Sequence, residues 1–293
     1  MSPLYKLGLV YIVEGKVDVT DVGQKLIKGE ISFGDFMLEA MLKFQYPNPY
    51  EGSYRTWNTK SFINALRLIK RVNELCEIKN IPAKGINKIE FGIFMLSLKN
   101  YEDVDRAAEG VLKFRQMYNS FKTEDEKEHF RIEYVREYLS GFKNPAKNTM
   151  EYADNMIRYM RLTKYICIKG KYSYVYDIEP RRLTEINSIL ETDDGSVVQY
   201  SKDEWRNYMG IYGAYPLPFE TIEKLSEILA NTDRDINAIE LKLVITPTHS
   251  NPCANREEYK FEIEQRRKYR TELQNFEIKQ EYHNSLQKID EAI

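Results

Sequence analysis

Residues 148–171 are rich in Asn, Arg and Lys, whose side chains can form hydrogen bonds with the bases of duplex DNA or ion pairs with its phosphates. An Asn amide can form two hydrogen bonds with adenine, an Arg guanidinium can do the same with guanine, and Lys neutralises phosphate whatever the base. Four residues are candidates for reading bases or for fixing the register on the backbone, and three lysines are candidates for phosphate contacts. Together with one threonine, the candidate DNA-binding residues are Asn148, Thr149, Asn155, Arg158, Arg161, Lys164, Lys169 and Lys171.

The charge balance of this stretch differs from that of the whole chain. The 293 residues carry a formal net charge of −2, whereas residues 143–171 contain seven Lys and Arg against Glu151 and Asp154. A local positive patch concentrates attraction for an anionic partner on one surface. Two alternatives stay open: a solvated helix face with a lysine-rich turn, or pairing of Arg158 or Arg161 with Glu151, Asp154 or Glu179 inside the fold.

A helix followed by a hairpin is expected to position these side chains. The helix starts near residue 148 with Asn148 or Thr149 as its N-cap, and one apolar face is predicted for Tyr152, Met156, Tyr159 and Met160. From residue 165 the period changes to two, and Lys169-Gly170-Lys171 forms a tight turn before a second strand that ends near 178. A helix and then a hairpin is the second half of a winged helix, with Lys169 and Lys171 at a basic wing tip.

The rest of the chain is mostly helical. Residues 7–20 repeat the hairpin pattern around a Glu14-Gly15 turn, so a first winged helix whose start is missing is predicted. Thr123 is expected to cap the helix before the recognition helix, and Thr192 to Ser196 is expected to be a turn. Further helices are predicted over 33–45, 58–79, 88–99, 101–118, 122–139, 180–190, 221–229 and 255–293, with a strand near 238–246. The predicted fold class is mainly α with short β-hairpins, with tandem winged-helix-like subdomains and a C-terminal helical linker.

Most catalytic signatures are absent from the sequence. It contains no GxGxxG, no P-loop, no GxSxG and no HExxH, and the three His and three Cys are widely separated. Glu240 and Lys242 have the ExK spacing of metal-dependent nucleases, but ordinary amphipathic strands share it. No catalytic or metal-binding residue is assigned, therefore, and a small Mg²⁺-dependent nuclease using Glu240 and Lys242 is kept as an alternative. No apolar run reaches the roughly 18 residues of a membrane span, and the start lacks a signal-peptide layout, so a cytoplasmic location is predicted.

Several segments in a fixed order resemble the AlwI-type family of type IIS restriction and nicking endonucleases, in their N-terminal DNA-recognition region. The resemblance covers roughly residues 7–229 and is carried by VTDVGQKL, KFQYPNPY, INKIEFGIFMLSLKN with VDRAAEGVLKFR, IRYMRLTKYI and LPFET. It implies two winged-helix-like subdomains that read a short asymmetric site as a monomer. It also implies a helical linker and a separate nuclease domain of the PD-(D/E)xK kind that uses Mg²⁺.

The expected organisation follows from this resemblance. Residues 1–121 are predicted to hold a partial winged helix and a helical subdomain, 122–235 a second winged-helix-like subdomain, and 236–293 a strand and a charged linker helix. The expected function is sequence-specific recognition of double-stranded DNA, with no cofactor in this chain and with the nuclease domain missing from it. A second nuclease subunit is left open as a partner. A tandem winged-helix transcriptional regulator or replication-initiator-like protein, dimerising through residues 255–293, is the main alternative.

Overall fold

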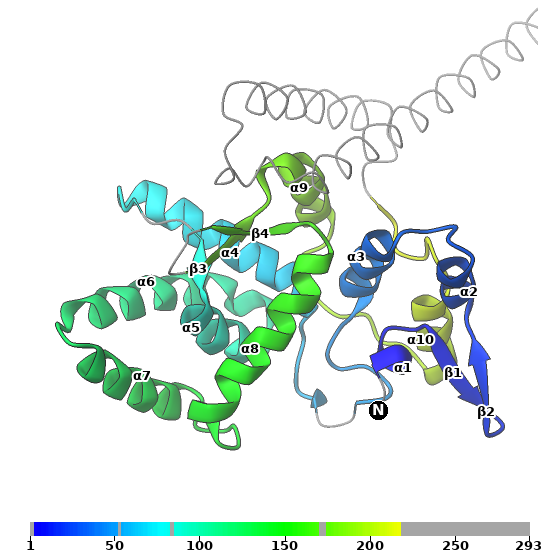
Figure 1. Ribbon diagram of the computed structural model, residues 1–293, viewed down its shortest axis with the longest axis horizontal. Helices are drawn as coiled ribbons and strands as arrows, with labels where there is room; N and C mark the ends of the chain where they lie inside the picture. The colour runs from blue at the N-terminus through cyan, green and yellow to red at the C-terminus, as the bar shows by residue number, and fades with distance from the viewer. Residues whose placement is uncertain (1–2, 52–53, 83–84, 170–173, 218–293) are drawn as a thin grey trace, which may run out of the picture. The chain divides into compact units, whose positions relative to one another are not determined.

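The fold is mainly helical, with short strands. The computed structural model describes residues 3–51, 54–82, 85–169 and 174–217, and these contain ten α-helices and two small antiparallel sheets (Figure 1). This agrees with the predicted class of a mainly α protein with short hairpins. The chain divides into two units, one formed by residues 1–179 with 190–216 and the other by 180–189 with 217–293. None of the described helices is long and apolar enough to cross a bilayer.

The first sheet is the predicted N-terminal hairpin. β1 (Val10–Val13) and β2 (Lys16–Val19) pair antiparallel, and Val13 lies opposite Lys16. Glu14 and Gly15 between them both have positive φ, 51° and 77°, as a two-residue turn that matches the twist of the strands requires. The predicted Glu14-Gly15 turn is therefore confirmed.

An N-terminal lobe forms around this hairpin from both ends of the described chain. It contains α1 (Pro3–Lys6), α2 (Asp21–Ile27), α3 (Phe33–Lys43) and, from much later in the sequence, α10 (Lys202–Gly210), which packs against α2 and α3. Its core is Val22, Phe36, Met37 and Ala40. We call residues 3–45 with 196–216 the N-terminal lobe.

Two charged residues of α3 hold the chain that leaves α10. The Nζ of Lys43, which is 1% exposed, donates to the carbonyl oxygen of Ile211 at 2.7 Å and is paired with Glu39. Glu39 also accepts from the backbone N–H groups of Gly213, at 2.7 Å, and Ala214, at 3.2 Å. Burial lowers the pKa of Lys43, although the Glu39 charge opposes it. The pair thus satisfies three backbone groups of the chain that follows α10.

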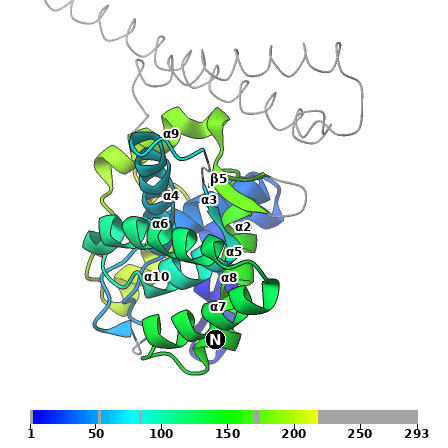
Figure 2. The same cartoon turned by 90° about the vertical axis from the view of Figure 1, so that its left-hand side faces the viewer.

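A second group of helices packs around α4 (Ser61–Ile78). In both views α6 (Val104–Ser120) lies between α4 and α7 (Glu124–Tyr138) (Figures 1 and 2). Thr123 caps α7, as predicted, and also forms a capping box with Glu126. The predicted helix over 58–79 is also confirmed, and its apolar stripe is buried: Phe62, Ala65, Leu66, Ile69, Val72 and Leu75.

The second sheet joins distant parts of the chain. β4 (Ile166–Lys169) and β5 (Val175–Ile178) form the second predicted hairpin, and β3 (Ile86–Asn87) pairs with β5 to give the order β3-β5-β4. The two-residue β3 was not predicted. After it come α5 (Lys88–Glu90), the π-helical turn η2 (Phe91–Met95) and the 3-10 turn η3 (Tyr101–Asp103). The pairing of β3 with β5 crosses the predicted boundary at residue 121, and the domain limits themselves stay predictions.

Only a short part of the second unit is described. η4 (Pro180–Arg182) leads into α9 (Leu183–Thr192), and the buried Arg182 and Glu185 pair at 3.4 Å. The predicted helices over 221–229 and 255–293, the predicted strand near 238–246 and the pair Glu240 and Lys242 lie outside the described residues.

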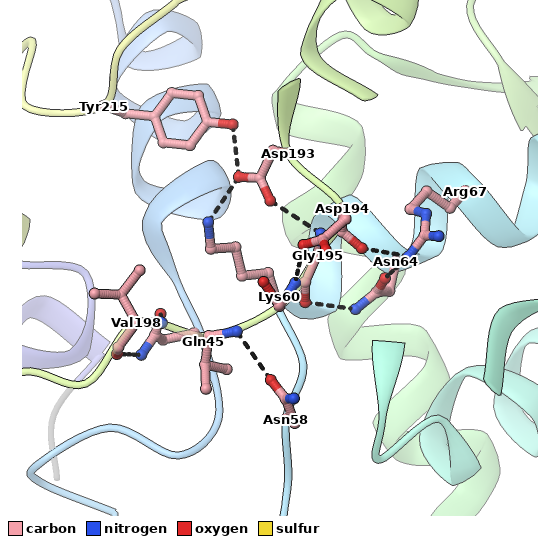
Figure 3. A network of polar contacts seen from close by, with 12 residues as sticks. Gln45, Asn58, Lys60, Asn64, Arg67, Asp193, Asp194, Gly195, Val198 and Tyr215 are labelled. Carbon is pink, nitrogen blue, oxygen red and sulfur yellow. Dashed lines mark hydrogen bonds and ion pairs between the residues drawn. The ribbon is translucent and has the colours of Figure 1, made fainter. Parts of the chain in front are cut away.

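The loop after α9 is tied to the start of α4 by a polar network (Figure 3). The Asp193 carboxylate accepts from the Nζ of Lys60 at 2.7 Å and from the Tyr215 hydroxyl at 2.8 Å. The carbonyl oxygen of Gly195 accepts from the backbone N–H of Lys60 at 2.8 Å and from the amide of the fully buried Asn64 at 3.0 Å. Burial and the charge of Asp193 raise the pKa of Tyr215, so its hydroxyl stays protonated and donates.

Two further side chains form hydrogen bonds with the backbone of this loop at Val197 and Val198. Asn58 accepts from the N–H of Val197 at 2.9 Å, and the Gln45 amide both accepts from the N–H of Val198, at 3.1 Å, and donates to its carbonyl, at 2.5 Å. The predicted turn over 192–196 is thus the start of a segment whose polar backbone is satisfied by the helical part of the protein. We call residues 193–198 the docking loop.

Gly195 is the position where the docking loop leaves no room for a side chain. Its φ is +83°, and an added Cβ would lie 2.7 Å from the Cγ of Asn64. We expect Gly195→Ala to lower the free energy of unfolding by about 2–4 kcal/mol, the combined cost of a left-handed Ala and of displacing a buried side chain. Urea unfolding followed by circular dichroism measures this change.

Gly213→Ala is the matched control, because Gly213 also has φ +83° but no atom lies within 4 Å of its added Cβ. Gly213→Ala should lower the free energy of unfolding by about 1 kcal/mol, the cost of placing Ala in the left-handed backbone region. Equal losses for the two variants would show that the contact with Asn64 contributes nothing.

Candidate nucleic-acid interface

The helix that carries most candidate residues begins one turn earlier than predicted. α8 (Pro145–Leu162) has Pro145 in its first turn and Asn144 as the N-cap, in the left-handed region at φ 48°. The predicted N-caps, Asn148 and Thr149, are wrong. Pro145 starts the helix because it lacks the N–H that would be unpaired there, and Asn148 instead donates to the carbonyl of Lys143 at 2.8 Å.

α8 is also rotated relative to the prediction. Its buried residues are Thr149, Ala153, Ile157 and Met160, so of the predicted apolar face Met160 is buried and Met156 is half-buried. Tyr152 and Tyr159 were placed in the core, but they are 50% and 39% exposed. Thr149, Ala153 and Ile157 follow each other at intervals of four and give an equally good stripe, which small residues can bring closer to a neighbouring helix.

Gly92 permits that close approach. It lies in η2, and a Cβ added to it would be 2.8 Å from the Cγ2 of Thr149 and 3.4 Å from the Cβ of Ala153. The Thr149 hydroxyl donates within α8 to the carbonyl of Pro145. Thr149 is 2% exposed, so its side chain packs α8 against η2 and does not reach the surface.

The exposed cations of α8 are free to meet an anion. Arg158 and Arg161 are both exposed, and within the described ranges neither guanidinium has an ion pair or a hydrogen bond. Asp154 is paired with Lys88 of α5 at 2.6 Å. This pair removes the nearest acidic partner, because a carboxylate at i lies next to the residue at i+4 on a helix. The pairings of Arg158 and Arg161 with Glu151, Asp154 or Glu179 are therefore not observed in this part of the chain.

Lys169 of the β4–β5 hairpin, unlike Arg158 and Arg161, is held in an ion pair. Lys169 is paired at 2.6 Å with Asp177, which is 4% exposed and also accepts from the Asn73 amide at 2.8 Å. Burial would lower the pKa of Lys169, but the hydrogen bond and the charge of Asp177 outweigh it, and the pKa is raised. Lys169 is thus positively charged at neutral pH, but its charge is already paired with the Asp177 carboxylate. Gly170 and Lys171 of the predicted tip lie outside the described residues.

Cys167 in the same hairpin is a protonated thiol at neutral pH. Burial, with the nearby Glu179 charge, raises the pKa of its thiol to about 11, whereas nucleophilic attack and metal binding both need the thiolate. Its Sγ lies 3.5 Å from the carbonyl oxygen of Ile178. Lys164, just after α8, is exposed and has φ 62°, which ends the helix.

The structure therefore brings together part of the predicted set. Asn155 and Arg158 are neighbours on the exposed face of α8, Arg161 lies on its flank, and Lys164 follows at its end. Thr149 is buried and Asn148 is engaged with the backbone. Tyr152 and Tyr159 also lie on the exposed face. The sequence prediction assigned them to the buried face because their rings fit the helical spacing of an apolar stripe.

Comparison with known proteins identifies the family. The family model described as AlwI restriction endonuclease matches residues 5–293. The chain belongs to the AlwI restriction endonuclease family. The predicted resemblance is confirmed, and the match extends beyond its expected end at residue 229. A search of the curated proteins found no significant match. Membership of a restriction endonuclease family implies DNA as the substrate.

The Mg²⁺ implied for AlwI-type nucleases finds no ligand set in the part of the chain that the structure describes. No group of three or more His, Cys, Asp or Glu side chains is arranged there to hold a metal ion. Mg²⁺ prefers several oxygen ligands with near-octahedral geometry, and the described residues do not provide such a set.

The contact between Gly92 and Thr149 predicts a rescue. Gly92→Ala should push α8 outward and lower the free energy of unfolding by about 1–3 kcal/mol, because a buried methyl is forced against the Thr149 methyl. Thr149→Ser removes that methyl and keeps the hydroxyl. We expect the double variant Gly92→Ala/Thr149→Ser to regain most of the loss in urea unfolding, and simple addition of the two single losses would contradict this packing.

Proposed function

We propose that this AlwI family member recognises a specific sequence in double-stranded DNA, as the recognition portion of a type IIS restriction or nicking endonuclease. The observation that carries the proposal is the exposed face of α8, where Asn155 and Arg158 have no partner among the described residues and the acid Asp154 is neutralised by Lys88. An amide and a guanidinium on one helix face are the groups that pair with adenine and guanine in the major groove.

The order of elements supports a winged-helix arrangement for this region. α4, β3, further helices, α8 and the β4–β5 hairpin follow one another, and β5 pairs with β3 on one side and with β4 on the other. In this arrangement α8 is the recognition helix and β4–β5 is the wing, with Lys169 close to the backbone of the DNA. We retain the β1–β2 hairpin as the wing of a first, similar subdomain.

Electrostatics favours the same partner. Lys147, Arg158 and Arg161 of α8 are exposed, and Lys164 follows them, while Glu151 is the one exposed acid of the helix. Such cations bind phosphate by releasing counterions, which gives affinity without sequence preference and makes it strongly dependent on salt. The uncharged Asn155 then supplies sequence dependence that charge alone cannot give.

The proposal assigns binding, and not cleavage, to the described residues. It takes one chain to act as a monomer on an asymmetric site, as the resemblance to AlwI-type endonucleases implies. The alternative of a dimerising regulator depends on residues 255–293, which lie outside the described residues, and the family match favours the restriction function over it.

Arg158→Ala should weaken binding to all duplexes and flatten its salt dependence. Loss of one phosphate or base contact by a guanidinium is expected to reduce the slope of log Kd against log salt by about 1 and the affinity by about 10-fold near 100 mM salt. Fluorescence anisotropy with a site selected from randomised duplexes measures both quantities.

Arg136→Ala is the control for this experiment, because Arg136 is an exposed arginine of α7 that has no ion pair among the described residues. It should leave the slope and the affinity unchanged. Selection that retains no sequence, or equal effects of the two substitutions, would rule out recognition through α8.

Cleavage is tested separately with Mg²⁺. We expect the chain to retain a selected duplex without cutting either strand at millimolar Mg²⁺, as followed on a denaturing gel with each strand labelled. Mg²⁺-dependent nicking that Glu240→Ala abolishes would instead establish the alternative of a small nuclease using Glu240 and Lys242.

A further inference from the structure

Two tyrosines share the exposed face of α8 with Asn155. Tyr152 and Tyr159 are seven residues apart, close to two full helical turns, and Asn155 lies between them. Leu162, 37% exposed, continues the same line toward the end of the helix. The four side chains therefore form one stripe along α8, which we call the reading stripe: Tyr152, Asn155, Tyr159 and Leu162.

These two tyrosines differ from most others in the chain. Tyr134 stacks on Tyr138 with ring centroids 5.6 Å apart, and Tyr46 packs against Tyr54 at 4.4 Å. In the part of the chain that the structure describes, neither Tyr152 nor Tyr159 packs against another ring, and neither hydroxyl has a hydrogen bond. Single exposed apolar side chains are ordinary, but a stripe of them on a helix face indicates contact with a partner.

The charges beside the stripe determine what that partner is. Arg158 lies next to Asn155, and Lys147 and Arg161 are exposed on the same helix. Of the two acids of α8, Asp154 is neutralised by Lys88, whereas Glu151, four residues before Asn155, is exposed, so three exposed cations outnumber one exposed acid. This excess of positive charge fits a partner that is anionic at its edges and that presents flat apolar and hydrogen-bonding groups at its centre. The major groove of DNA has this pattern, with phosphates along both sides and base edges and thymine methyls on its floor.

We propose that the reading stripe specifies an A·T pair, with the Asn155 amide on the N6 and N7 atoms of adenine and the ring of Tyr159 against a thymine methyl. This inference rests on the proposed function. Residues four apart on a helix have Cβ atoms about 5–6 Å apart, and successive base pairs are about 3.4 Å apart. Asn155 and Tyr159 can therefore address the same base pair or two adjacent ones.

The chemistry of each contact is distinct. Asn is matched to adenine because its amide offers one donor and one acceptor in the same plane, whereas an aromatic ring has no directional preference and recognises thymine by the methyl that cytosine lacks. The tyrosine adds no charge, so it contributes to the choice of base and little to the salt dependence. The lysines and arginines contribute in the opposite way.

The experiment replaces each thymine of the selected site, one at a time, by deoxyuridine, which differs only by the missing methyl. Anisotropy at fixed salt should show one position at which the substitution weakens binding of the unaltered chain about three- to fivefold, the effect of one buried methyl. Tyr159→Ala should bind the thymine and deoxyuridine duplexes equally, and Tyr159→Phe should restore the preference because the ring makes the contact.

Asn155 is tested with 7-deazaadenine, which lacks the N7 acceptor. A single substituted adenine, next to or paired with the sensitive thymine, should weaken binding by the unaltered chain and have no effect on Asn155→Ala. Adenine and thymine positions that are not adjacent would overturn the shared reading of one A·T step.

The outcomes separate this inference from the proposed function. If the chain selects no sequence, the proposed function fails and the inference falls with it. If it selects a site and Arg158→Ala flattens the salt slope, but no deoxyuridine position matters or Tyr159→Ala keeps the preference, only the inference is overturned. A selected site without an A·T pair also overturns the inference alone, as does a face that binds an acidic protein instead of DNA.

Discussion

The docking of residues 193–198 onto the start of α4 is the constraint on which the larger unit depends. Lys60 and Asp193 are 133 residues apart in sequence, and their contact is at 2.7 Å with both side chains almost buried. Removing one partner of such a pair typically costs about 3–5 kcal/mol, because the other charge is left unpaired away from water. Within the docking loop, Asn58 and Gln45 bind the backbone of Val197 and Val198, and Tyr215, beyond α10, binds Asp193 (Figure 3).

Local features of the fold could be read from the sequence. The Glu14-Gly15 turn and the N-cap Thr123 are confirmed because short-range chemistry determines them: positive φ in the first case and unpaired N–H groups in the second. The helix predicted over 58–79 is confirmed as α4 because its apolar residues recur at helical spacing over a wide face. β3 escaped prediction because two residues form a strand only when a distant partner, here β5, pairs with them.

At the interface, distant parts of the chain determine which side chains are exposed and unpaired. Composition alone gave seven cations against two acids, but which cations are free depends on partners elsewhere in the chain: Asp154 is held by Lys88, and Lys169 by Asp177. The rotation of α8 could not be derived either, since tyrosines and smaller residues offer two stripes. The choice is made by Gly92, which lets Thr149 and Ala153 approach and thereby turns Tyr152 and Tyr159 outward.

The N-terminal lobe has a consequence for how the protein is made. Its hairpin, α2 and α3 are the first elements to be synthesised, yet they are completed by α10 and by residues 211–214, which Lys43 and Glu39 bind across 168 to 175 residues of sequence. The elements from α4 to β5 have most of their partners within the intervening chain. On a ribosome, therefore, the part made first must wait with its apolar core partly uncovered until residue 216 has emerged. The part of the chain that is synthesised first is therefore the last to complete its packing.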